Sequence, residues 1–335
     1  MLFRSLARDY ALRLEQEGQG DPDSDAALAA TAALHITCFF LGELTTARAH
    51  AESLLHRYRR ERHQRLAYLY GFDLEVMCGG YLGHCLWYLG HVAQARPVYE
   101  RAVACAREIS HPYSLTFAMF AAGVFAQGLQ DVAAVRELSQ SLHHIAAQQG
   151  YPHVALQAEF LGGWVQAKEG QAQAGIARMQ AVMSARRKVG SELSLTMLLA
   201  IIAQLELESG QPDAALATIT DAVQRMNANG ERFAAAEVLR VQAEILRRKS
   251  RGAYLEYPLD GAPEDLFLRA LDIARCQQAR LFELRAATSL CQMWRAEGNR
   301  AEAAGLLEQT LVRCSGLADS QDGRAAHALH TELSR

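Results

Sequence analysis

The sequence has 335 residues and a formal net charge of −3, so it lacks the basic excess that is typical of nucleic-acid-binding domains. Half of its residues are hydrophobic, but no apolar run approaches the roughly 18 residues of a membrane span, and charges interrupt the N-terminal segment where a signal peptide would be apolar. We therefore expect a cytoplasmic protein with neither a membrane nor a nucleic acid as partner. The 7 cysteines include no C-x-x-C pair, which is typical of reduced thiols.

The chain opens with residues 1–25, which we expect to form an N-terminal helical extension. After it, one pattern recurs, in which a turn glycine is followed five positions later by a small residue. The turns are Gly42…Ala47, Gly90…Ala95, Gly170…Gly175, Gly210…Ala215 and Gly298…Ala303. Each of the two longer gaps between them holds one additional unit, so the period is about 40 residues. We expect the small residue to lie where two helices approach most closely.

The stretches on either side of each turn are rich in good helix formers, and prolines suited to the first helical position precede several of them. Composition and period together predict an all-α fold, an α-solenoid of about seven helix pairs forming one superhelical domain over 26–335. A polar helix near 322–333 is expected to cap the stack. The expected pairs lie near 26–60, 65–108, 112–149, 152–189, 191–229, 231–279 and 281–314.

One unit carries a repeat motif, which reads Gly79-x2-Leu82-Gly83-x2-Leu86 and then Ala95-x3-Tyr99. The motif resembles the tetratricopeptide pattern, although it lacks the tryptophan and the first tyrosine, and the period exceeds the usual length of about 34 residues. We therefore expect tetratricopeptide-like helix pairs, whose first helices line a concave groove.

An insertion at 249–262 interrupts the sixth pair and contains two tyrosines, Tyr254 and Tyr257. Such segments are usually surface loops. The alternative is a lid or a contact with a partner.

Several longer stretches resemble a known family. They are FFLGELTTA at 39–47, HQRLAYLYGFDLEVMCGGYLGHCLWYLGHVAQA at 63–95 and FLRALDIARCQQARLFELRAATSLCQMWRAEGNR at 267–300. They are similar to the C-terminal tetratricopeptide-repeat region of large bacterial signalling proteins that join a class III adenylate cyclase or regulatory domain to a predicted P-loop ATPase. The resemblance implies a regulatory arm. This chain contains no G-x-x-x-x-G-K-[ST] motif, so the ATPase and cyclase activities of that family are not carried over.

No set of residues indicates catalysis or a metal site. Cys78, His84 and Cys85 lie on one predicted helix, from which three ligands do not readily surround a tetrahedral ion. Neither H-E-x-x-H nor G-x-S-x-G occurs. We therefore predict a protein that is not an enzyme and that needs no metal and no cofactor. An enzyme with its site inside the solenoid is the weaker alternative.

A local basic run contains Arg57, Arg59, Arg60, Arg62 and Arg65. It is interpreted as a solvated helix end, where cations complement the helix dipole. The alternative is a contact with an anion or an acidic partner.

The expected binding site is the concave groove. Positions six, three and two residues before each turn glycine should face it, which places aromatic and polar side chains there together. These aromatic side chains have an alternative role as plugs between repeats. The groove residues are His84, Trp87, Tyr88, Met119, Gln127, Phe160, Trp164, Lys168, Gln204 and Glu208.

The sequence thus predicts a non-catalytic regulatory or scaffold protein that binds a protein segment or effector in its groove, as part of signal transduction. The alternative is a small-ligand sensor arm of a STAND-type ATPase or of a transcription regulator. The partner itself, the oligomeric state and the question of a larger parent protein are open at this point.

Overall fold

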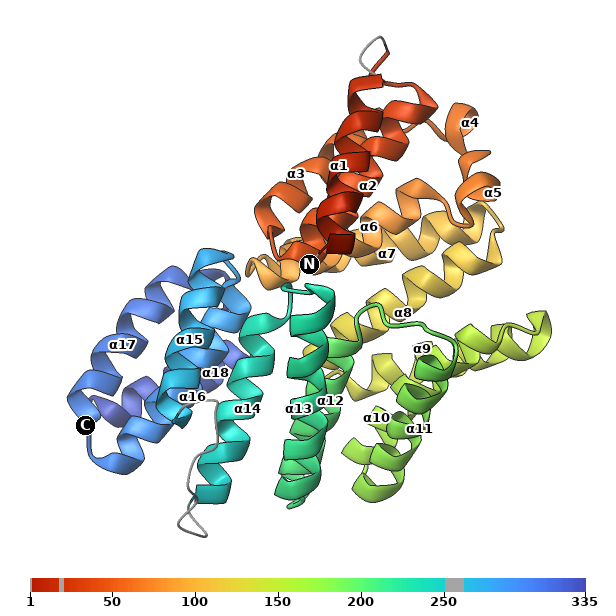
Figure 1. The fold of residues 1–335 in the computed structure, drawn as a ribbon. Coiled ribbons are helices and arrows are strands. Elements are labelled where there is room, and N and C mark those ends of the chain that lie inside the picture. Colours follow the sequence, from red (N-terminus) through yellow and green to blue (C-terminus); the bar gives the residue numbers. More distant parts are fainter. Residues whose placement is uncertain (1, 18–20, 251–261) are drawn as a thin grey trace. The chain divides into compact units, whose positions relative to one another are not determined.

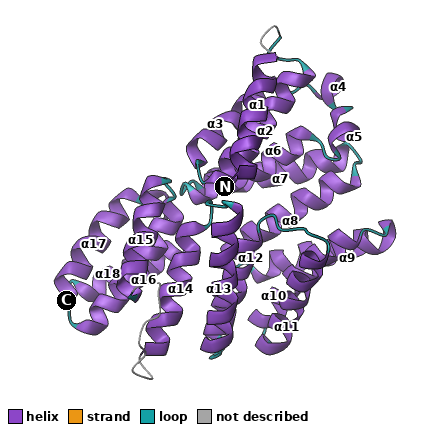
Figure 2. Ribbon diagram, in the orientation of Figure 1, coloured by secondary structure: helices purple, strands orange, loops and turns teal. Residues whose placement is uncertain are grey.

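The computed structural model describes residues 2–17, 21–250 and 262–335, and every regular element in them is helical. Figure 2 shows these helices joined by loops. Most of the expected insertion at 249–262 lies outside the described residues. Because every regular element of the described residues is a helix, the all-α prediction is confirmed.

Seven consecutive helix pairs follow one another along the chain (Figure 1), and in each pair the two helices pack together. The prediction of a tetratricopeptide-like solenoid with about seven pairs is confirmed. The pairs are α2 (Asp25–Leu41) with α3 (Leu44–Arg57), α6 (Leu74–Tyr88) with α7 (Val92–Glu108), α8 (Pro112–Gly128) with α9 (Val132–Gln149), α10 (Pro152–Lys168) with α11 (Ala172–Lys188), α12 (Leu195–Glu208) with α13 (Pro212–Asn229), α14 (Ala235–Ser250) with α15 (Pro263–Cys276), and α16 (Arg280–Glu297) with α17 (Arg300–Arg313).

Four further helices lie outside this pattern. The N-terminal helix α1 (Leu2–Glu17) packs against α2, and two short helices, α4 (Arg60–His63) and α5 (Leu66–Tyr70), connect the first pair to the second. The C-terminal helix α18 (Gln321–Leu333) follows a 3-10 turn and packs against α16 and α17.

The chain divides into two compact units. Unit 1 contains residues 1–87 and 93–189, and unit 2 contains residues 88–92 and 190–335. The assignment of 1–25 as an extension and of 26–335 as one superhelical domain stays a prediction.

Local sequence explains where many helices begin and end. Helices α8, α10, α13 and α15 each begin at a proline, whose fixed φ suits the first helical position. The Ser24 hydroxyl accepts a hydrogen bond from the amide of Ala27 and so caps α2. At the end of α9, Gly150 adopts a left-handed φ of 67°, which glycine adopts without the steric cost of a side chain.

The small residue after each turn lies where the two helices of a pair meet. Ala47, Ala95, Ala215 and Ala303 are fully buried. In the fourth pair the approach is closer still, because a Cβ on Gly175 would lie 2.3 Å from the carbonyl oxygen of Gly163. Helices α10 and α11 therefore touch backbone to backbone, as the spacing of the turns predicted.

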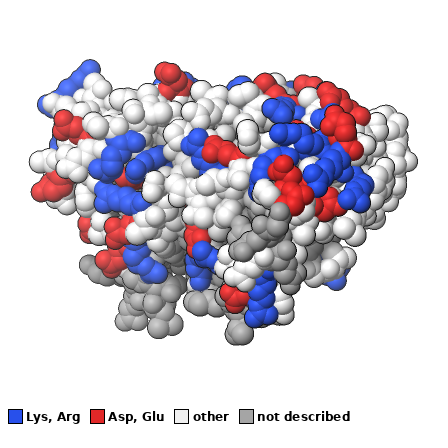
Figure 3. Space-filling view, turned by 90° about the horizontal axis from the view of Figure 1, so that it is seen from above, with Lys and Arg blue, Asp and Glu red and all other residues white. Residues whose placement is uncertain are grey.

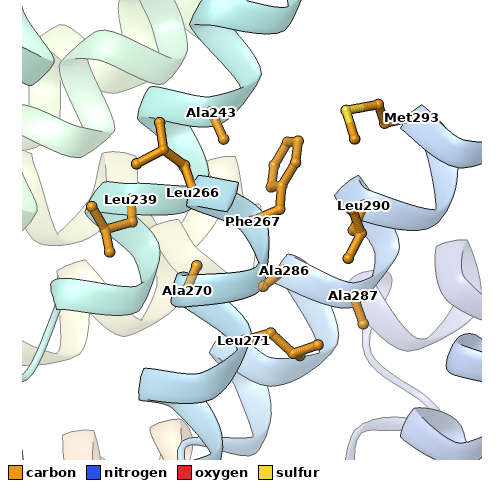
Figure 4. Packing of buried hydrophobic residues seen from close by; sticks show 10 residues of the cluster. All are labelled: Leu239, Ala243, Leu266, Phe267, Ala270, Leu271, Ala286, Ala287, Leu290 and Met293. Atoms are coloured by element: carbon orange, nitrogen blue, oxygen red, sulfur yellow. The ribbon is translucent and has the colours of Figure 1, made fainter. Parts of the chain in front are cut away.

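Within unit 2, helices α14, α15 and α16 enclose an apolar core (Figure 4). Phe267 and Leu271 of α15 lie between Leu239 of α14 and Leu290 of α16. Burial of side chains of this size contributes about 1.5–3 kcal/mol each. Phe267 and Leu271 are four residues apart and so lie on one face of α15. This face joins the sixth helix pair to the seventh.

No helix in the described ranges combines the length and the apolar character needed to cross a bilayer.

Two glycine substitutions should have opposite effects on stability. Gly175→Ala is expected to destabilise the protein by about 2 kcal/mol, because the methyl group would overlap the backbone of α10. Gly305→Ala, inside α17 where a Cβ meets no atom within 4 Å, is the control and is expected to stabilise it by about 0.5–1 kcal/mol. Urea denaturation of both variants measures the difference, and equal effects would contradict the assigned packing.

Candidate functional site

The ten predicted groove residues lie on the first helices of four pairs, α6, α8, α10 and α12, but most are not accessible. His84, Lys168 and Gln204 are half-buried and Glu208 is exposed. These ten residues therefore form no exposed aromatic wall, and a binding role for them stays a prediction. The buried residues are Trp87, Tyr88, Met119, Gln127, Phe160 and Trp164.

Trp87 fills the interface between α6 and α8. Its indole ring meets Phe125 edge to face, with ring centroids 5.5 Å apart, and covers Gly128 so closely that a Cβ there would lie 2.0 Å from the ring. This is the interface-plug role considered for the aromatic residues. The glycine of one helix thus provides the space that the tryptophan of the neighbouring helix occupies.

The neighbouring residue, Tyr88, belongs to unit 2. Its ring lies 4.8 Å from Phe282 and 6.3 Å from Phe233, measured between centroids. It anchors the Tyr88–Val92 turn in the apolar interior of that unit. Trp87 and Tyr88 therefore belong to two different packing environments although they are adjacent in sequence.

On α10, Phe160 and Trp164 are fully buried, and Lys168 is the predicted groove residue of this helix that reaches solvent. The Lys168 ammonium group lies 5.8 Å from the centre of the Trp164 ring, a cation–π contact one turn along the same helix. The tryptophan thus positions the lysine, and the lysine is the part of this group that a partner can reach.

The remaining groove residues of unit 1 have different surroundings. His84 shares a 2.6 Å hydrogen bond with the Tyr99 hydroxyl, and burial lowers its pKa to about 3, so its imidazole is neutral. Met119 lines a hollow of about 390 Å³ together with Arg107 and His144. The side-chain oxygen of Gln127 is buried without a hydrogen-bond partner among the described residues.

A polar network crosses the first helices of three successive pairs in unit 2. Arg240 of α14 binds both carboxylate oxygens of Glu237, at 2.9 and 3.0 Å, and donates to the side-chain oxygen of Gln204 on α12 at 3.2 Å. Arg285 of α16 donates to Glu237 at 3.3 Å. Its Nε and Nη2 atoms also hold both oxygens of Asp322 on α18, at 3.1 and 3.0 Å. We call these five linked side chains the arginine–carboxylate network: Gln204, Arg240, Glu237, Arg285 and Asp322.

The charges of this network stabilise one another in a sheltered environment. The side chains of Glu237 and Arg240 are only 9% and 11% exposed. Burial alone would raise the pKa of Glu237, but the guanidinium groups of Arg240 and Arg285 outweigh it and lower that pKa to about 2. Both arginines have pKa values raised by their carboxylate partners despite burial, so both guanidinium groups stay charged.

The network was missed in the sequence because the groove positions were counted back from turn glycines. The sixth pair has the insertion where its turn glycine would lie, so α14 contributed no groove residue. A signal was nevertheless present. Glu237, Arg240, Glu244 and Arg247 recur every three or four residues, which places them on one face of a helix that is otherwise rich in buried apolar residues.

One group of side chains in unit 1 has the composition of a metal site. Donor atoms of Asp73, Glu75 and Cys105 lie within 4.8 Å of one another. Asp73, however, accepts hydrogen bonds from the Tyr58 hydroxyl and from the amide of Val76, which caps α6. Burial, together with the nearby Glu75 carboxylate, raises the pKa of the Cys105 thiol to about 12. These contacts give the group a structural role.

The basic run near residue 60 makes intramolecular contacts. Arg62 and Arg65 pair with Asp21 and Asp25, in the segment that precedes and begins α2, and Arg60 pairs with Glu108 of α7. Arg59, Arg62 and Arg65 are nevertheless exposed, as the interpretation of a solvated helix end expects. The ion pairs are contacts that the sequence did not indicate.

No protein-family model matches the chain. Among curated proteins, an uncharacterized protein of Rhizobium meliloti (strain 1021) is 26% identical over 223 residues, which are 67% of this chain and 21% of that protein. The chain thus spans about a fifth of the length of that relative.

Among solved structures, a Rap protein complexed with competence and sporulation factor aligns with a TM-score of 0.57 and 12% identity, over 98% of this chain and 92% of that one. Yeast Tom70 aligns with a TM-score of 0.45 and 12% identity, over 99% of this chain and 59% of that one. The similarity to the Rap protein concerns the fold, which is a tetratricopeptide-like helical repeat.

The lowered pKa of Glu237 predicts a specific loss of stability in acid. Because the folded pKa of about 2 lies below the ordinary value of 4.5, ionised Glu237 stabilises the fold above pH 4.5, and this contribution is lost as the pH falls toward 2. The loss should be about 3 kcal/mol. Denaturation across this range should show a flatter pH dependence for Glu237→Gln than for the wild type. Identical slopes would show that the network does not hold this carboxylate ionised.

Proposed function

We propose that the protein is a non-catalytic scaffold that binds a peptide segment of a partner protein along the first helices of unit 2. The observation that carries this proposal is the arginine–carboxylate network, which spans α12, α14 and α16 and reaches α18. Stability alone does not explain such a network, because replacing buried ion pairs by packed apolar residues is often neutral or stabilising.

The network carries the hydrogen-bond donors and acceptors that an extended peptide needs. A peptide backbone presents unpaired N–H and C=O groups, which lose hydrogen bonds to water on binding and must regain them from the receptor. Gln204 and Asp322 lie at the two ends of the network, and Glu208 continues it along α12 through a 3.1 Å hydrogen bond from Gln204. Donors and acceptors fixed by neighbouring ion pairs lose little entropy when a ligand binds.

The accessible and the buried groove residues are proposed to have different roles. Gln204 and Glu208 of unit 2 are proposed to contact the peptide directly. Lys168 and His84 belong to unit 1 and are proposed as binding residues of that unit's own surface. The buried members are each proposed to support the groove face of their own unit from within, as the packing of Trp87 in unit 1 and of Tyr88 in unit 2 supports. They are Trp87, Met119, Gln127, Phe160 and Trp164 in unit 1 and Tyr88 in unit 2.

A second candidate function is a small-ligand sensor arm within a larger signalling protein, such as a STAND-type ATPase. The match to about a fifth of a much longer relative favours it. The two functions differ in their ligand, because a sensor arm would bind a small molecule and no peptide. The signalling context and the cytoplasmic location belong to both proposals.

Peptide binding can be tested with a random peptide library displayed on phage and selected on the purified chain. For an enriched peptide, Gln204→Ala and Glu208→Ala are each expected to weaken binding by about 1 kcal/mol or more, measured by isothermal titration calorimetry. The matched control is Gln224→Ala, an exposed glutamine on α13, the second helix of the same pair. No enrichment, or equal losses in all three variants, would contradict the proposal.

The isolated chain is expected to hydrolyse no ATP and to form no cyclic nucleotide, because it has no phosphate-binding loop. Phosphate release and cyclic nucleotide should stay at the level of a buffer blank. Activity that follows the protein through successive columns would overturn this prediction.

A further inference from the structure

A second charged site lies at one end of unit 2, where α15 ends, α16 begins and α17 ends. Its centre is Glu283, whose side chain is completely buried. Three arginines pair with this one carboxylate. Their nitrogens lie 3.3 Å away for Arg275, 2.6 Å for Arg280 and 2.8 Å for Arg313. We call these four residues the Glu283 cluster.

The Glu283 cluster carries an excess of positive charge. Three guanidinium groups and one carboxylate leave a net charge of +2, whereas the arginine–carboxylate network pairs two arginines with two acids. Burial would raise the pKa of Glu283, but hydrogen bonds from Arg280 and Arg313 lower it, so the carboxylate stays ionised. The Glu283 cluster therefore keeps its net positive charge at neutral pH.

Helix ends modify this charge only in part. Arg275 and Arg313 lie in the last turns of α15 and α17, whose partial negative charge offsets some of the excess. Arg280 begins α16, whose amino end adds partial positive charge and has no side-chain cap. Helix ends carry about half a charge each, so most of the excess remains.

The arginines remain accessible although their carboxylate does not. Their side chains are 38%, 30% and 34% exposed, for Arg275, Arg280 and Arg313 in turn. Arg275 donates a hydrogen bond to Glu283 through Nε alone, and Arg280 donates one through Nη1 alone. A guanidinium group has five N–H donors, so most remain directed away from the carboxylate. Figure 3 shows blue side chains with red ones beside them on the left of the view, the side on which Figure 1 places α15–α17.

We propose that the Glu283 cluster is a binding site for the phosphate group of a small molecule. A phosphate dianion matches the net charge of +2, and guanidinium groups bind phosphate oxygens through paired N–H donors. All three arginines contact Glu283, so three guanidinium groups are brought together at this end of unit 2. This site shares no residue with the peptide surface on α12, α14 and α16, and it does not depend on that function.

The test is isothermal titration calorimetry of the full chain at low ionic strength with inorganic phosphate, AMP and acetate. Phosphate and AMP are expected to bind with dissociation constants below about 10 mM, and acetate, a monoanion, at least about tenfold more weakly. Tighter binding of AMP would identify a nucleotide as the source of the phosphate, and equal binding would identify the phosphate group alone. Absence of phosphate binding, or equal binding of acetate, would overturn the proposal.

Two arginine variants locate the site. Arg275→Gln removes the most exposed arginine with the longest contact, so it should weaken phosphate binding at least about fivefold while the protein stays folded. Arg295→Gln is the matched control, because Arg295 lies on α16, is 36% exposed and pairs one to one with Glu332. It should leave phosphate binding unchanged. Equal affinities of the wild type and Arg275→Gln would refute the assigned site.

Glu283→Gln provides an independent check with the opposite sign. Removing the central charge raises the net charge of the cluster to about +3, so phosphate binding should tighten in protein shown to be folded by circular dichroism. Weaker binding by the folded variant would contradict the proposed electrostatic basis of the site. If this variant does not fold, the comparison of Arg275→Gln with Arg295→Gln still decides the question.

Discussion

The close contact between the two helices of each pair is the constraint on which the rest of this structure depends. Ala47, Ala95, Ala215 and Ala303 are fully buried at this contact, and Gly175 lies against the backbone of the opposite helix. A larger side chain there would separate the helices and misalign the faces they present to the next pair. Because five of the seven pairs have this contact, the chain extends by repetition, and no central core has to grow with its length.

Successive pairs are joined by a similar close packing, in which large side chains lie against glycines. This packing also determines where the aromatic residues lie. Glycines on the first helices leave space into which large side chains of the neighbouring first helix pack, as Trp87 does on Gly128 and Leu161 on Gly123. Aromatic residues that a groove model places on the surface are therefore used between repeats. The first helices are consequently left with polar side chains as their accessible chemistry.

Arginines in unit 2 serve two different purposes. In the arginine–carboxylate network each arginine is matched by an acid, and burial makes that matching necessary, since an unpaired charge there would be costly. Around Glu283 the matching is incomplete, and the arginines are about one-third exposed, so solvent compensates the excess charge. A balanced, sheltered network suits a surface of fixed hydrogen-bond donors and acceptors, whereas an unbalanced, accessible cluster suits an anion.

The sequence by itself determined the helical class and the number of pairs, because the turn glycines, helix-starting prolines and small residues act over only a few neighbouring residues. The spacing of Glu237, Arg240, Glu244 and Arg247 held a signal of the charged face of α14, but counting back from the turn glycines did not use it. Only the tertiary structure decided that Trp87 and Trp164 are buried. It also decided that Arg240 meets Gln204 and that three arginines converge on Glu283. Except for Arg280 and Glu283, which are three residues apart on α16, these contacts join residues on different helices. Helical periodicity shows which face a residue occupies but not which neighbour covers that face.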